Sequence, residues 1–190
     1  MDKDRDLLKA AKGMSFQEVV ALEEMSTTRR ETGIAKIEGA INYLNLCLEN
    51  EEKVVVFVNH KEVARALADA FGDKAVSIVG STPNKQRQAN RDRFMADPTC
   101  RIIIGSKAMA EGWTLTAAHH VVFAEIFWVP GIMHQCADRC HRIGQRENVL
   151  VTYLVMDQTL DAHMVKTLVR KVRIQEAAID GRKESNVRTA

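Results

Sequence analysis

The sequence predicts an α/β domain built on a doubly wound, mainly parallel sheet. Five short runs rich in β-branched residues lack polar alternation, which indicates strands covered on both faces. These runs are Val54–Val58, Ala75–Val79, Arg101–Ile104, Val121–Phe123 and Val149–Val155. The segments between them have about the length of crossover helices, so strand and helix alternate through the middle of the chain. At 190 residues, the chain fits one such domain with a single core.

A helix is predicted before the first strand. Apolar residues recur there at three- and four-residue steps and so share one helix face. They are Ile34, Ile37, Ile41, Leu44 and Leu48. The preceding stretch, Met25–Gly33, carries two threonines and a run of charge, and it reads as a connector that leads into this helix.

Three further helices follow from spacing and capping signals. Lys61–Phe71 carries apolar residues at helical spacing. Thr82 followed by Pro83 predicts a helix start with Thr82 as its cap, and Asp97-Pro98 predicts the end of that helix. Thr159–Ile179 has apolar residues four apart and predicts a last amphipathic helix.

Composition excludes several classes of protein. The formal net charge is +2, so any nucleic-acid binding has to come from a local patch of charge. Four scattered cysteines suit a reducing compartment rather than a disulfide framework. No stretch approaches the ~20 apolar residues of a membrane span, and no signal-peptide pattern is present. We expect an intracellular soluble protein without a membrane partner, in the cytoplasm or nucleoid of a bacterium or virus, or in a eukaryotic nucleus.

The segment Gln135–Gln145 is the most informative in the chain. On a helix, Gln135, Arg139 and Arg142 fall within about 60° of one another, beside an apolar stripe. That stripe consists of Ile132, Cys136, Cys140 and Ile143. Two rigidly held guanidinium groups suit a polyphosphate, because each offers a planar fork of donors and a fixed charge. The alternative is an ordinary solvated helix face. A metal site is not expected, because the cysteines lie on the packed face and lack a second ligand pair.

The wording Gln-x-x-x-Arg-x-His-Arg-Ile-Gly-Gln resembles the sixth helicase motif of Swi/Snf-type DNA-translocating ATPases. The resemblance extends from about Thr32 to Gly181. The matching segments are Lys53–His60 (fourth motif), Gly80–Thr82 with the helix after it, Ile102–Ala118 (fifth motif), Val121–Trp128, and Gln158–Asp161 with the last helix. The wording is closest to the annealing-helicase, HARP-like branch. Met109 and Ala110 stand where most relatives have two glycines, and Thr114 where most have asparagine.

The resemblance implies a RecA-like second motor lobe with a defined division of the chain. An N-terminal helical segment and connector would occupy residues 1–50, the lobe residues 51–158, and a C-terminal bracing helix and tail residues 159–190. It further implies that Arg142 is an arginine finger, Arg139 a second γ-phosphate contact and Gln135 a residue that organises them. Gly112 and Trp113 would lie at the nucleotide.

The same resemblance implies contacts with a DNA backbone. Ser106 and Lys107 match positions that touch phosphates in relatives. Further candidates follow other strand ends, namely Asn59, His60, Gly80, Ser81 and Thr82. Because ligands of doubly wound sheets bind beyond the carboxyl ends of the strands, we expect the functional loops at that edge. For each residue the alternative is a loop polar group or a helix cap.

The phosphate-binding half of such a motor is missing from the sequence. No Gly-x-x-x-x-Gly-Lys-Ser/Thr and no Asp-Glu-x-His box occurs. ATP and Mg²⁺ would therefore be held mainly by a first RecA-like lobe on the same polypeptide, with duplex or forked DNA as the other partner. This chain alone is expected not to hydrolyse ATP.

Two rival interpretations remain open from sequence. The chain is either a half-motor or a standalone nucleic-acid-binding or regulatory module without catalysis, and the intact arginine pair favours the motor. An unrelated doubly wound enzyme would need a glycine-rich loop after the first strand, and Val58–Lys61 offers none.

Overall fold

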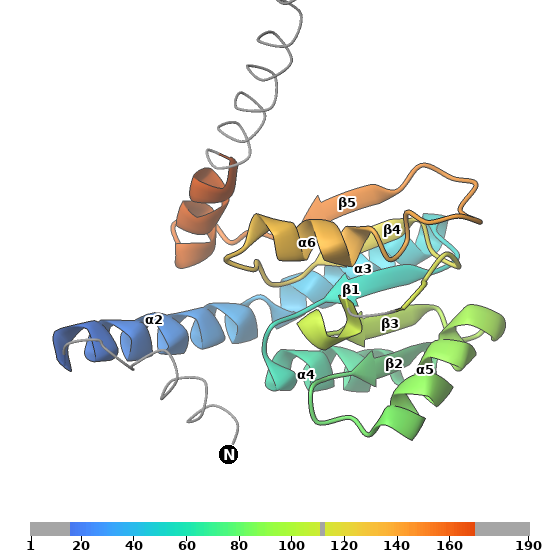
Figure 1. Cartoon of the computed structure of the whole chain (residues 1–190), viewed down its shortest axis with the longest axis horizontal. Coiled ribbons are helices and arrows are strands. Elements are labelled where there is room, and N and C mark those ends of the chain that lie inside the picture. Colours follow the sequence, from blue (N-terminus) through green and yellow to red (C-terminus); the bar gives the residue numbers. More distant parts are fainter. Residues whose placement is uncertain (1–15, 111–112, 170–190) are drawn as a thin grey trace, which may run out of the picture.

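The computed structural model describes residues 16–110 and 113–169 of the chain. A five-stranded sheet lies at its centre, in the order β2-β3-β1-β4-β5, and every strand pair is parallel (Figure 1). The strands are β1 (Val54–Phe57), β2 (Ala75–Ile78), β3 (Ile102–Gly105), β4 (His120–Phe123) and β5 (Leu150–Tyr153). The predicted doubly wound α/β fold is confirmed, and each predicted strand is present with small shifts at its ends.

Helices cover both faces of the sheet, as the unbroken apolar strands predict. They are α2 (Phe16–Ala35), α3 (Ile37–Asn50), α4 (Lys61–Phe71), α5 (Asn84–Ala96) and α6 (Pro130–Ala137), with short 3₁₀ turns η1 (Gly72–Lys74) and η2 (Lys107–Ala110). Residues 160–169 are also helical. Every residue of β1, β3 and β4 is buried, whereas the edge strand β5 is exposed at both of its ends.

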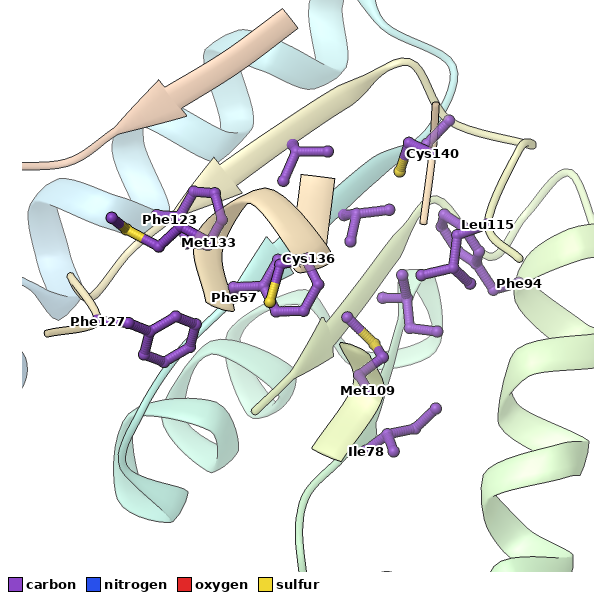
Figure 2. Close-up of a cluster of buried hydrophobic side chains, with 14 of the residues drawn as sticks. Phe57, Ile78, Phe94, Met109, Leu115, Phe123, Phe127, Met133, Cys136 and Cys140 are labelled. Atoms are coloured by element: carbon purple, nitrogen blue, oxygen red, sulfur yellow. The ribbon is translucent and has the colours of Figure 1, made fainter. Parts of the chain in front are cut away.

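Successive residues of β1 point into two different cores. Val54 and Val56 pack with α3 and α4, for example against Leu67. Val55 and Phe57 pack on the opposite face, in a second cluster that Figure 2 shows. That cluster takes side chains from α5, η2, α6 and the last helix, namely Phe94, Met109, Cys136 and Met164. Each large side chain removed from water in this way contributes about 1.5–3 kcal/mol, so the two cores fix the helices against the sheet.

The helix predicted before β1 is present, but the connector before it is not. Met25–Gly33 lies inside α2, which runs without a break to Ala35. The threonines that suggested a connector are accommodated by their hydroxyls, because Thr28 donates to the carbonyl of Glu24 at 2.9 Å and Thr32 to that of Thr28 at 2.8 Å. Side-chain bonding of this kind lets threonine remain in a helix that tertiary contacts hold in place.

The predicted helix boundaries elsewhere are close to those observed. Lys61–Phe71 is α4 as predicted, and α5 ends at Ala96, directly before Asp97. The capping role of Thr82 is wrong: Pro83 occupies the N-cap position, and the Thr82 hydroxyl instead accepts a bond from the Val79 amide at 3.0 Å. The last helix is confirmed over residues 160–169, and the remainder of its predicted range lies outside the described residues.

Among the described residues, none of the helices has the length and apolar character to cross a membrane.

Candidate functional site

Three strand-end loops lie side by side at one edge of the sheet. Since β2, β3 and β1 are consecutive in the sheet and parallel, the residues that follow them meet at the same edge. These residues are Gly80–Thr82 after β2, Ser106 and Lys107 after β3, and Asn59 and His60 after β1. The structure therefore brings the candidate DNA-contacting residues into one row. Gly80, Ser81 and Lys107 are exposed, whereas His60 is buried.

The loop after β2 is held by an arginine of the helix that follows it, part of the segment that resembles the family but not assigned a role from the sequence. Arg87 of α5 donates to the carbonyl of Thr82 at 2.7 Å and to that of Gly80 at 2.8 Å. The Thr82 amide donates to the Val79 carbonyl at 2.9 Å. The Thr82 amide is therefore used within the loop and does not face a ligand.

The loop after β3 turns directly into η2. The Ser106 carbonyl accepts a bond from the Met109 amide at 2.8 Å, and the Ser106 hydroxyl lies 3.4 Å from the Ala108 amide. Met109 packs so close to Gly105 that a Cβ at that glycine would lie 2.6 Å from the Met109 sulfur. The tight turn leaves the Lys107 side chain exposed at the edge.

The arginine segment differs from the prediction in its geometry. Helix α6 ends at Ala137, so Arg139 and Arg142 do not share a helix face with Gln135. Tight turns follow, in which the Arg139 amide donates to the Cys136 carbonyl at 3.2 Å and the Cys140 amide to the Ala137 carbonyl at 3.0 Å. These turns return Cys140 to the core, where it is fully buried. Cys140 thus stays in the core beside Cys136, although the chain between them is no longer helical after Ala137.

The two arginines have different environments. Arg139 is 9% exposed, and its Nε donates to the Gln135 carbonyl at 3.2 Å. Arg142 is exposed, and its Nη1 lies 3.3 Å from the Thr114 hydroxyl. The Arg139 carbonyl also accepts a bond from the Leu115 amide at 2.8 Å, which joins the two segments that resemble the fifth and sixth helicase motifs.

A pocket of about 780 Å³ lies beside Arg142. It is lined by Thr114, His141, Arg142, Ile143, Gln145, Arg146, Glu147 and Asn148. Gln145 braces this turn, because its amide group donates to the Ala118 carbonyl at 2.9 Å while its carbonyl accepts from the Arg146 amide at 2.9 Å. Gly144 has a φ of +104°, a conformation that favours glycine. Of the residues predicted at a nucleotide, and within residues 16–110 and 113–169, only Arg142 lines the pocket.

The pocket does not lie in the row of strand-end loops. Its walls include Thr114, and the Gln145 amide reaches Ala118, both in the segment that leads into the start of β4. Arg142 and this pocket therefore lie away from the row of strand-end loops. Trp113 is half-buried against the core, and Gly112 lies outside the described residues.

The cysteines of this segment pack in the core. Cys136 and Cys140 are fully buried, and burial raises the pKa of each thiol to about 12. Because a zinc-bound cysteine has to lose its proton, this burial disfavours metal binding. No group of three or more potential ligands is placed to hold a metal within the described part of the chain.

Glu125 is a residue of this region that the sequence did not assign to the site. It follows β4 and is 4% exposed. Its carboxylate accepts the backbone N–H groups of Asn59 and His60 at 2.7 and 2.9 Å, and it contacts the His60 ring. Its signal in the sequence is an acidic residue two positions after the apolar run Val121–Phe123, at the start of a strand-end loop.

Comparisons with known proteins agree with this arrangement. Residues 35–144 match the model of the helicase conserved C-terminal domain. The chain is 35% identical over 183 residues to the DNA annealing helicase and endonuclease ZRANB3 of Mus musculus, which covers 94% of this chain and 17% of that protein. It is 36% identical over 148 residues to the SWI/SNF-related matrix-associated actin-dependent regulator of chromatin subfamily A-like protein 1 of Xenopus tropicalis, covering 75% of this chain and 16% of that protein.

A solved structure supports the same assignment. The C-terminal part of the Fun30 ATPase domain superimposes with a TM-score of 0.63 at 27% identity, covering 69% of this chain and 44% of that one. The chain thus corresponds to a small part of its curated relatives, and its matches fall on a single lobe. Taken with the parallel sheet and the two joined motif segments, these matches show that the chain belongs to the helicase conserved C-terminal domain family, as a Swi/Snf-type member of the annealing-helicase branch.

Proposed function

We propose that the chain is the second motor lobe of an ATP-dependent double-stranded-DNA translocase or remodeller. A first RecA-like lobe would hold ATP and Mg²⁺, and this lobe would close on the nucleotide and grip one DNA strand. The observation that carries the proposal is the exposed Arg142 guanidinium beside a pocket of about 780 Å³, on a turn joined to the fifth-motif segment.

Arg142 is the arginine finger in this proposal. Phosphoryl transfer places charge on the oxygens of the moving group, and an arginine that neutralises this charge contributes roughly 10³–10⁵ in rate. Arg142 suits the role because its side chain is exposed and its neighbour on the turn, Gly144, sets a tight bend. Arg139 is buried against the Gln135 carbonyl, so it supports the turn and would reach a phosphate only after the turn moves.

The row of strand-end loops is the proposed DNA grip. Lys107 supplies a charge at the exposed edge, and Ser81 and Ser106 supply hydroxyls on either side of it. Such groups contact phosphates and carry no base information, so the proposed grip is independent of DNA sequence. His60 is buried and supports the loop, which leaves Asn59 as the partly exposed residue after β1.

The test supplies the first lobe, either fused to the chain or mixed with it, and measures ATP turnover with duplex and forked DNA. Arg142→Ala is expected to lower turnover by roughly 10³ or more while DNA binding remains unchanged. Arg65→Ala, an exposed arginine on α4 paired with Asp69, is the matched control and should have no effect. ATP hydrolysis by the 190-residue chain alone, or full turnover by R142A, would contradict the proposal.

A further inference from the structure

We infer that Glu125 is a positioning residue that couples the DNA-facing loop after β1 to helix α6 and its arginine turn, and that helix α2 holds the Glu125 carboxylate in place. This inference rests on the proposed function, since it concerns how DNA contact reaches the nucleotide side. Glu125 touches neither nucleotide nor DNA in this account, and it acts through Asn59 and His60.

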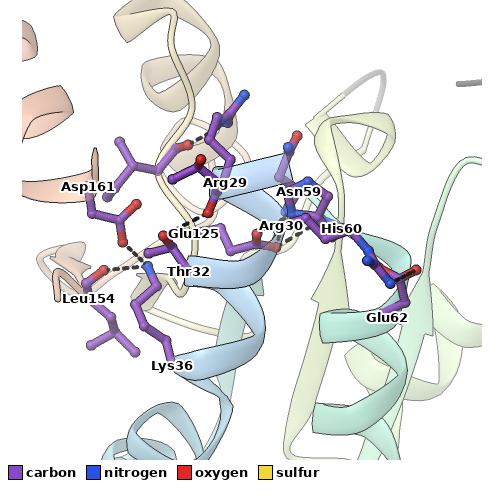
Figure 3. Close-up of polar contacts among 12 residues, drawn as sticks. Arg29, Arg30, Thr32, Lys36, Asn59, His60, Glu62, Glu125, Leu154 and Asp161 are labelled. Atoms are coloured by element: carbon purple, nitrogen blue, oxygen red, sulfur yellow. Dashed lines mark hydrogen bonds and ion pairs between the residues drawn. The ribbon is translucent and has the colours of Figure 1, made fainter. Parts of the chain in front are cut away.

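Three donors converge on the one carboxylate. Oε2 accepts the backbone N–H of Asn59 at 2.7 Å and that of His60 at 2.9 Å, while Oε1 lies 2.5 Å from the His60 Nδ1 (Figure 3). Glu125 and His60 are 4% and 9% exposed, so water does not compete for these bonds. A carboxylate fits this position because it is acceptor-only and offers two oxygens.

The link sits where the strand order reverses. β3 and β2 lie on one side of β1, whereas β4 and β5 lie on the other, and Glu125 and Asn59 follow the adjacent strands β4 and β1. Doubly wound enzymes commonly bind a small ligand at such a switch point. Here a side chain of the protein itself occupies the position. The position at which such folds usually bind a ligand is therefore filled here by the contact between the loops after β1 and β4.

Helix α2 closes the site from the outside. Gly33 lies so near that a Cβ on it would be 2.4 Å from Oε1 of Glu125, a distance at which one group has to move. Arg29 donates to the Ile126 carbonyl at 3.1 Å and lies over the Trp128 ring at 5.8 Å from its centroid. The same stretch of α2 therefore holds both the carboxylate and the segment that follows it.

A second set of contacts keeps α2 from sliding along this edge. Arg30 binds Glu62 of α4 at 2.8 Å, and Lys36 contacts Asp161 and donates to the Leu154 carbonyl at 3.0 Å (Figure 3). Helix α2 and the residue after it thus contact segments that follow β1, β4 and β5. A displacement of the loop after β1 has to move Glu125 as well.

The route from this link to the arginine turn is short and continuous. Residues 126–129 follow Glu125 directly, Ile126 and Phe127 are buried, and α6 begins at Pro130. Helix α6 ends at Ala137, one turn before Arg139 and Arg142. Because α6 is a rigid helix of 8 residues, a shift at its start moves the turn at its end, and the core contacts of Met133 and Cys136 limit the size of that shift.

The test compares Glu125→Gln and Gly33→Ala with Gly39→Ala in the chain supplied with its first lobe. The amide of E125Q offers a single acceptor oxygen where two are used, and G33A drives a methyl group into Oε1. Gly39 is the matched control, a helical glycine with nothing within 4 Å of an added Cβ. The readouts are turnover without DNA, turnover at saturating DNA, and the melting temperature.

Both test variants are expected to lower the DNA stimulation of turnover by about fivefold or more, the usual range of coupling between two sites. Turnover without DNA should stay within about twofold of wild type. G39A should match wild type in both turnover readouts, with a melting temperature equal to or slightly above that of wild type, because alanine favours a helix over glycine. Wild-type stimulation in E125Q would overturn the inference. A parallel loss of turnover with and without DNA would do the same, because it would mean a purely structural role.

A second measurement separates this inference from the proposed function. Amide hydrogen exchange at Asn59 and His60 in the 190-residue chain needs neither nucleotide nor DNA. E125Q should speed exchange at both amides by about tenfold or more, since their acceptor is weakened. Wild type that shows no DNA-stimulated turnover with a first lobe would contradict the proposed function. If E125Q still speeds exchange at these two amides in that case, the contact of Glu125 with the loop after β1 remains supported. Unchanged exchange refutes the link itself.

Discussion

The buried contact between Lys36 and Asp161 allows a sharp test of how the terminal helices join the lobe. Each residue is 7% exposed, and the Lys36 ammonium also donates to the Leu154 carbonyl at 3.0 Å. Lys36→Met leaves the Asp161 carboxylate buried without this cation, a change that costs about 3–5 kcal/mol. At roughly 2–4 °C per kcal/mol for a chain of this size, the melting temperature should fall by about 6–20 °C. Thermal unfolding followed by circular dichroism measures it.

Two further variants decide whether burial is the cause. Replacing both partners, as Lys36→Met with Asp161→Leu, removes the unpaired charge and should recover most of the lost stability. Arg65→Gln removes the exposed contact with Asp69 and should cost less than about 0.5 kcal/mol. If K36M lowered the free energy of unfolding as little as R65Q, the contact between Lys36 and Asp161 would not hold the N-terminal and C-terminal helices on the lobe as described. The proposed division at residues 50 and 158 would then mark independent parts.

Three other predictions concern pH and DNA. Burial raises the pKa of Cys136 and Cys140 from 9.0 to about 12, so their contribution to the free energy of unfolding is complete below pH 9 and declines between pH 9 and 12. The decline should reach up to ~1.4 kcal/mol per pH unit for each thiol. Urea unfolding at pH 8, 9 and 10 measures it, and a free energy of unfolding that does not change with pH refutes the prediction. Burial lowers the pKa of His120 below 6.5, so the contribution of this histidine to the free energy of unfolding is present above pH 6.5 and is lost on acidification. Between pH 7 and pH 5, the His120→Gln variant should therefore lose less stability than wild type. Lys107→Ala should weaken binding to all duplex sequences alike and reduce the salt slope by about 1, whereas an unchanged slope would remove Lys107 from the proposed grip.

Much of the fold followed from short-range pattern. The runs at Val54–Val58 and Arg101–Ile104 are apolar on both faces, and both form central strands with every residue buried. Lys61–Phe71 was predicted to its ends because Val63, Leu67 and Phe71 recur at helical spacing, and all three are buried in α4. The order of the strands has no local signature, since it depends on which side of β1 each crossover takes.

The misses have physical causes of their own. Residues 25–33 lack a strong apolar stripe, and their helix is supported by contacts far along the chain. Arg29 contacts the Ile126 carbonyl, Arg30 contacts Glu62 of α4, and Gly33 lies against Glu125. Helix periodicity placed Arg139 and Arg142 side by side, but α6 ends at Ala137 and tight turns carry the two arginines, an end that has no signal in the apolar spacing. The resemblance identified Arg142 as a site residue, but it gave no role to Gln145, which lines the same pocket and bonds to the Ala118 carbonyl.

The most direct measurement is a structure of the chain joined to its first lobe, with Mg²⁺ and a transition-state analogue of ATP bound. The account predicts that the Arg142 guanidinium lies about 3 Å from the oxygens or fluorines at the γ-phosphate position, a distance typical of charge-assisted hydrogen bonds. DNA in the same complex should run along Ser81, Lys107 and Asn59. An Arg142 side chain that points away from the nucleotide in the closed complex would contradict the account.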